Sequence, residues 1–103
     1  MKVNNLTIKS SAAPTVECDW PSRAAYIRFG KAKVSKTVSP DQPGAVVAID
    51  LDAKGDVVGV ELVGIKELSI HCFVKLIPMN TRSVNWDRAR FVPTGCREEL
   101  QPA

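Results

Sequence analysis

The chain has 103 residues and a formal net charge of +3; 45% of its residues are hydrophobic and 24% are charged. These values suit one folded domain and exclude an intrinsically disordered chain. The longest apolar run, residues 45–49, is too short to span a membrane, and the first residues lack the apolar stretch of a secretory signal. We therefore expect a cytoplasmic protein with no membrane segment.

Strand patterns follow a leader at residues 1–14, in which Leu6 and Ile8 alternate and suggest a short strand. Apolar alternation predicts strands at 15–18, 24–29 and 34–38, with a turn at 19–22 and a proline-rich loop at 40–44. Within 24–29, alternation places Tyr26 and Arg28 on the face opposite the apolar residues.

The strongest local pattern predicts a β-hairpin of residues 46–51 and 57–62 with Lys54 and Gly55 at its tip. Its expected pairs are Leu51 with Val58, Ile49 with Val60, and Val47 with Leu62. All six side chains then share one apolar face, while the opposite face carries Ala48, Asp50, Gly59 and Glu61. A slip of one residue would exchange the two faces, so this register is strongly specified.

Residues 64–77 fit two structures. Strict alternation between Leu68 and Leu76 fits a strand, whereas Ser69 as an N-cap, with Phe73 and Ile77 on one side, fits a short helix. We prefer the helix because a sheet with one apolar face needs a cover. The expected fold is α+β and mostly β: a small antiparallel β-sheet of meanders and hairpins, with a short helical segment after the last strand.

We expect residues 15–77 to form one β-rich domain and residues 78–103 to be a C-terminal extension. Its apolar residues, among them Val84, Trp86 and Phe91, indicate that it packs in part, through a turn of helix at 85–90, and we expect its end to fray.

No metal or cofactor is expected. A four-ligand zinc site would need the only histidine, His71, and every cysteine of the chain: Cys18, Cys72 and Cys96. Their odd number, without an export signal, indicates free thiols in a reducing compartment. Residues 50–61 partly match a calcium loop, but Lys54 stands where an oxygen ligand belongs.

The one polar constellation that we expect joins Tyr26 and Arg28 to Asp50 and Glu61. If both pairs occupy the same face of one sheet, two carboxylates meet an arginine and a phenol. Ion pairing on a half-solvated face is the simplest interpretation, and acid–base chemistry is the alternative. The small residues Ala24, Ala48 and Gly59 leave room there for the chain's own tail, a second copy or a ligand.

The pattern Asp19-x-x-x-Arg23-Ala-Ala-Tyr-Ile, followed by Asp-x-Asp-x-x-Gly-x-Val-Val-Gly-Val-Glu at 50–61, resembles the small bacterial domain-of-unknown-function family 2283 over about residues 15–70. The resemblance implies a small antiparallel sheet with a short helical segment, and an antitoxin-like binding role as a hypothesis. It implies no cofactor or catalytic residue. The family usually has aspartate three positions before the tyrosine, where this chain has Arg23, so no role of that aspartate is expected.

The leading functional hypothesis is a non-catalytic binding module, not an enzyme, that forms a homodimer or other homo-oligomer or binds a protein partner. One alternative is contact with nucleic acid through a basic hairpin at residues 28–36, with Arg28, Lys31, Lys33 and Lys36. We disfavour it because the basic bias is modest and lysines also protect sheet edges. The other alternative is a small enzyme that uses Asp50 and Glu61.

Overall fold

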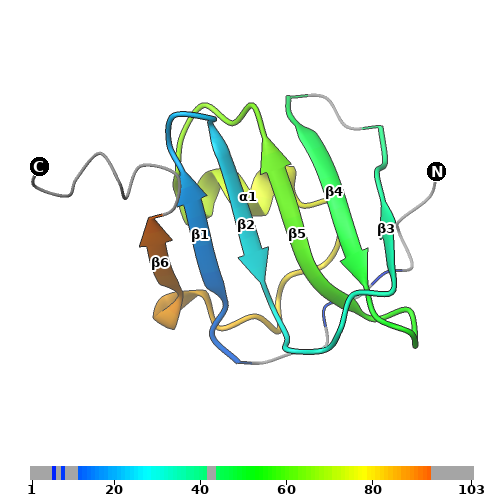
Figure 1. The fold of residues 1–103 in the computed structure, drawn as a ribbon. Helices are drawn as coiled ribbons and strands as arrows, with labels where there is room; N and C mark the ends of the chain where they lie inside the picture. The colour runs from blue at the N-terminus through cyan, green and yellow to red at the C-terminus, as the bar shows by residue number, and fades with distance from the viewer. Residues whose placement is uncertain (1–5, 7, 9–11, 42–43, 94–103) are drawn as a thin grey trace, which may run out of the picture.

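Six strands form one mixed sheet in the computed structural model, which describes residues 6, 8, 12–41 and 44–93 (Figure 1). In chain order they are β1 (Thr15–Asp19), β2 (Ala24–Arg28), β3 (Lys36–Val38), β4 (Val46–Leu51), β5 (Val57–Val63) and β6 (Arg90–Pro93). Their order across the sheet is β3-β4-β5-β2-β1-β6. Neighbours are antiparallel except β6, which runs parallel to β1. The mostly-β prediction is confirmed, with this one parallel pair in addition.

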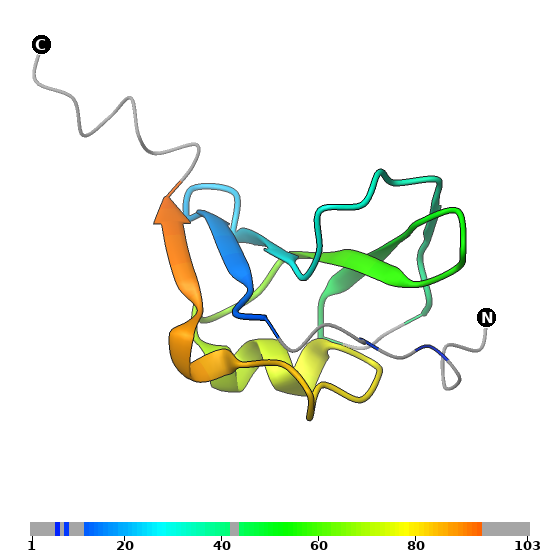
Figure 2. The same ribbon diagram turned by 90° about the horizontal axis from the view of Figure 1, so that it is seen from below.

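The short helix α1 (Ile70–Leu76) lies across one face of the sheet (Figures 1 and 2). The Ser69 hydroxyl accepts a hydrogen bond from the Cys72 N–H at 3.2 Å, which satisfies one of the free donors of the first turn. Phe73 and Ile77 are buried against the sheet. The helical interpretation of residues 70–77 is therefore confirmed and the strand interpretation is wrong. No helix in the described part of the chain has the length and apolar character to cross a bilayer.

The hydrophobic core lies between the sheet and α1. Its central row runs across five strands through directly paired residues, which are all buried: Val16, Ile27, Val60, Ile49 and Val38. Ile8 is also buried, and its carbonyl accepts a hydrogen bond from the Ser83 hydroxyl at 2.6 Å. Neither Leu6 nor Ile8 is in a strand. Ile8 thus helps to close the core without joining the sheet.

The hairpin of β4 and β5 has the expected register over most of its length. Ile49 pairs with Val60 and Val47 with Leu62, but Leu51 pairs with Val57, so the expected pairing of Leu51 with Val58 is wrong. A β-bulge makes Val58 an extra residue that is buried outside the contiguous core. The Val58 carbonyl accepts the N–H groups of Phe29 and Gly30 at 2.8 and 3.2 Å, and so fixes the chain leaving β2.

The hairpin turn is closed by Asp52. Its carboxylate accepts hydrogen bonds from the N–H groups of Lys54 and Asp56, each at 2.9 Å. Gly55 has a φ of +86°, a conformation that glycine adopts without strain.

Residues 28–36 are not a hairpin, which corrects the prediction of a basic hairpin there. β2 and β3 are separated in the sheet by β5 and β4, so residues 29–35 cross the end of the β4–β5 hairpin on the face away from α1 (Figure 2). The physical reason is that β5 pairs with β2 along all of β2, which leaves β3 to pair with the free side of β4. β3 is correspondingly short, since Val34 and Ser35 lie in the crossover.

Residues 84–93 pack onto the same sheet. Val84 is buried, and Trp86, in the 3-10 helix η1 (Trp86–Arg88), contacts Phe29 edge-to-face at 5.9 Å. Phe91 of β6 stacks on Phe73 of α1 at 6.2 Å. The expected fraying falls on residues 94–103, outside the described residues.

We predict that Ile49→Ala lowers the free energy of unfolding by about 2–5 kcal/mol, because it removes a fully buried side chain from the centre of the core. Val46→Ala on the same strand is the matched control, because Val46 is 65% exposed and should change stability by less than about 0.5 kcal/mol. Urea unfolding of both variants tests the assignment. Equal losses would show that the faces of β4 are assigned incorrectly.

Candidate functional site

The sheet face turned away from α1 is covered by no helix in the described part of the chain (Figures 1 and 2). We call it the open face. Strand alternation and register define its residues. They are Thr15, Glu17, Asp19, Ala24, Tyr26, Arg28, Thr37, Val46, Ala48, Asp50, Gly59, Glu61, Val63, Arg90 and Val92. All four candidate residues from the sequence lie on this face.

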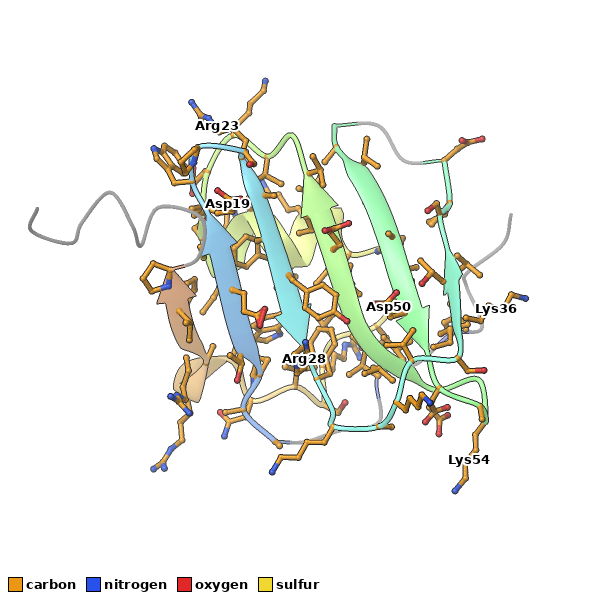
Figure 3. The ribbon with its side chains drawn as sticks, viewed as in Figure 1. Asp19, Arg23, Arg28, Lys36, Asp50 and Lys54 are labelled. Atoms are coloured by element: carbon orange, nitrogen blue, oxygen red, sulfur yellow. The ribbon has the colours of Figure 1, made fainter. Side chains whose placement is uncertain are left out.

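Tyr26 reaches diagonally from β2 across β5 to β4. Its hydroxyl donates a hydrogen bond to Asp50 Oδ2 at 2.7 Å, and the Thr37 hydroxyl donates to Asp50 Oδ1 at 2.5 Å. Gly59 lies beneath this bridge, and a Cβ atom there would collide with the Tyr26 ring and hydroxyl. Asp50 therefore ties together β2, β4 and the edge strand β3 (Figure 3).

The environment of Tyr26 favours its neutral form. Burial raises the pKa of the phenol well above its ordinary value, and the hydrogen bond to Asp50 and the charge of that carboxylate raise it further. Arg28, whose guanidinium carbon lies 5.0 Å from the ring centroid, lowers the pKa, but by less. Tyr26 thus keeps its proton, and its hydrogen bond to Asp50, at neutral and mildly alkaline pH.

Glu61 belongs to a different part of the open face. It pairs with Tyr26 on one side and Ala48 on the other, while Glu17 pairs with Tyr26 from β1. A shallow hollow of about 180 Å³ lies there, and we call it the acidic hollow. Its lining residues are Glu17, Asp19, Ala24, Ala25, Tyr26 and Glu61. Neither the Glu17 carboxylate nor the Glu61 carboxylate has a hydrogen bond or ion pair with another described residue.

The four predicted residues therefore form two groups that meet at Tyr26. Asp50 does not line the acidic hollow, and both of its oxygens accept hydrogen bonds from hydroxyl groups. Asp50 and Glu61 consequently do not meet in this hollow, whereas paired acid–base chemistry needs both carboxylates at one site. Among the described residues, no group of three or more His, Cys, Asp or Glu side chains could hold a metal ion.

Sequence reasoning missed Glu17, Asp19 and Thr37. Alternation within residues 15–18 could have placed Glu17 opposite the apolar Val16, but its alignment with Tyr26 depends on the geometry of the turn between β1 and β2. Thr37 reaches Asp50 only because β3 crosses to the far side of β4. No local pattern predicts that crossing.

Comparisons with protein-family models, with curated proteins and with solved structures found no match. The resemblance to domain-of-unknown-function family 2283 therefore stays a prediction, and no residue role is carried over from it.

Tyr26 is the only tyrosine of the chain, so the ultraviolet absorbance of tyrosinate reports on this residue alone. We predict that the folded chain forms tyrosinate only well above pH 10, the ordinary midpoint of about 10 returning when the chain is unfolded in urea. Because the pKa is raised in the folded state, the free energy of unfolding should fall as the pH rises above about 10. In Tyr26→Phe this fall should be smaller. A folded-state midpoint near 10 would contradict the bridge to Asp50.

We predict that Gly59→Ala breaks the Tyr26–Asp50 hydrogen bond and lowers the free energy of unfolding by about 1–3 kcal/mol, because the added methyl group displaces the Tyr26 ring. The same substitution in a Tyr26→Ala background should be nearly neutral, because the obstructing ring is gone. A double-mutant cycle by urea unfolding measures this coupling. Equal costs in the two backgrounds would mean that Tyr26 does not lie over Gly59.

Proposed function

We propose that this chain is a non-catalytic interaction module and that a protein partner docks on its open face. The observation that carries the proposal is the exposed apolar surface at one end of that face. Val46 is 65% exposed, and it lies in one cross-strand row with Val63 and Ala24. Exposed apolar side chains that gather on one sheet face are typical of a surface that becomes covered in an assembly.

A second exposed apolar side chain lies at the same end of the sheet and packs against Arg23. Trp20, in the turn between β1 and β2, is 48% exposed, and the Arg23 guanidinium carbon lies 4.4 Å from its ring centroid. The Arg23 guanidinium also donates to the Lys66 carbonyl at 3.1 Å (Figure 3 shows Arg23 at this end of the sheet).

Hydrogen bonds also hold the backbone of Arg23 in place. Its carbonyl accepts the N–H groups of Gly64 and Ile65, and these contacts hold its φ of +54°, which is uncommon for arginine. A tryptophan that packs against such a residue in the free chain loses less entropy when a partner covers it, which suits an anchor residue of an interface.

The two alternative functions find less support in the geometry. Asp50 does not line the acidic hollow with Glu61, and both of its carboxylate oxygens accept hydrogen bonds from hydroxyl groups. The basic residues of the crossover do not form one continuous face, because Arg28 lies over Tyr26 and Lys33 shares a hollow with Asp52 and Asp56. We also propose that the protein acts in the cytoplasm, a reducing compartment, which the free thiol of Cys72 supports.

We predict that short peptides selected from a random library on the immobilised full chain bind the open face. Val46→Asp should weaken their binding at least about tenfold, because it places a charge in the apolar row. Val74→Asp is the matched control: Val74 is 40% exposed, but it lies on α1, beyond the other face of the sheet. Binding is measured by titration calorimetry, and thermal unfolding confirms that both variants fold.

Light scattering on the same variants tests self-association directly. A homo-oligomer that Val46→Asp converts to monomers, while Val74→Asp does not, would support the proposal with a second copy as the partner. Peptides that are sensitive only to Val74→Asp would contradict it. So would a selection that recovers no peptide above a blank surface, from a chain that stays monomeric.

A further inference from the structure

We propose that the partner of the open face is a basic segment of another protein, and that one of its lysine or arginine side chains enters the acidic hollow beside Tyr26. This inference rests on the proposed function, since it names the chemistry of the partner that docks on the same face.

The charge of the open face favours a basic partner. This face carries four carboxylates, on Glu17, Asp19, Asp50 and Glu61, although the whole chain has a net charge of +3. The face is therefore opposite in sign to the rest of the protein. Of its two arginines, Arg28 lies over the ring of Tyr26, and Arg90 is on the edge strand β6. The middle of the open face thus favours a positively charged surface.

The shape of the acidic hollow suits the end of one long basic side chain. Ala24 has only a methyl group, Ala25 turns its side chain into the core on the other face of the sheet, Tyr26 contributes an aromatic ring, and the remaining lining residues are three acids. A volume of about 180 Å³ accommodates the end of one long side chain. The aliphatic part of a lysine or arginine can lie against Tyr26 and Ala24 while its charged end meets the carboxylates.

The carboxylates of the open face differ in whether they already accept hydrogen bonds from other residues. Asp19 accepts hydrogen bonds from Ser22, and Asp50 from Tyr26 and Thr37. The carboxylates of Glu17 and Glu61, which flank Tyr26 on the neighbouring strands, have no hydrogen-bond or ion-pair partner among the described residues. These two acids are therefore the ones that a cation from a partner would pair with.

The same charges disfavour other occupants. A second copy that stacked its open face on this one would bring carboxylates against carboxylates. The phosphates of a nucleic acid would be repelled for the same reason. A basic protein segment is the occupant that matches both the apolar row and the acidic hollow.

To test the inference, the peptides that are selected on the full chain are sequenced, and their affinity for the chain is measured. We expect lysine and arginine to be enriched in them, and replacement of these residues by glutamine to weaken binding at least about tenfold. Glu17→Gln and Glu61→Gln should each weaken binding about threefold to tenfold, and added salt should weaken it further.

Asp87→Asn is the matched control because it makes the same change of charge on η1, where the side chain is exposed and outside the open face. It should leave binding unchanged. Equal weakening by all three substitutions would show general attraction to the protein's charge and would overturn the inference.

Neutral or acidic peptides that still depend on Val46 would overturn this inference and leave the proposed function standing. A self-associated chain whose contacts map to the open face would do the same. Peptides that are insensitive to both Val46→Asp and the glutamate substitutions would overturn both proposals.

Discussion

The hydrogen bond from Tyr26 to Asp50 organises the open face. It crosses β5, so it requires a residue without a side chain at position 59, and it links β2 to β4 without a direct ladder between them. Thr37 extends the link to the edge strand β3. Because the ring of Tyr26 is drawn toward Asp50, the space above Ala24 on its other side stays unfilled, and the acidic hollow forms there. One contact thus links strands of the open face and leaves the acidic hollow beside it.

The open face is free to bind another molecule because the helix and the other core residues all lie on the opposite face of the sheet. Helix α1, Ile8 and Val84 all contribute to the core on one face, and no polar side chain is buried among the described residues. A chain of this size has few segments with which to cover a second face. The open face therefore carries a polar network that is satisfied in part from within the chain, together with exposed apolar residues whose burial requires another molecule.

Local patterns predicted the parts of the fold that local chemistry decides. Alternation and a glycine turn were enough to predict the pairing of Ile49 with Val60, whereas the cap at Ser69 favoured α1 only together with the need of the sheet for a cover. The bulge at Val58 depends on N–H groups that arrive from β2, so the hairpin's own sequence does not contain it. The same limit applies to the site: periodicity placed Tyr26 opposite the apolar face of its own strand and Asp50 opposite the apolar face of the hairpin. Their contact, and the position of Glu17 beside Tyr26, depend on the register between distant strands.

The account depends on an open face whose middle, around Ala48, is not covered by another segment of the described chain, with Tyr26 lying over Gly59. Nuclear Overhauser spectra of the isotope-labelled full chain measure both features at once. We expect contacts from the Tyr26 ring to the α-protons of Gly59, and contacts from the Ala48 methyl group only to residues of β3, β4, β5 and β2. Contacts from Ala48 to any other segment or to a second copy, or a Tyr26 ring without contacts to Gly59, would contradict it.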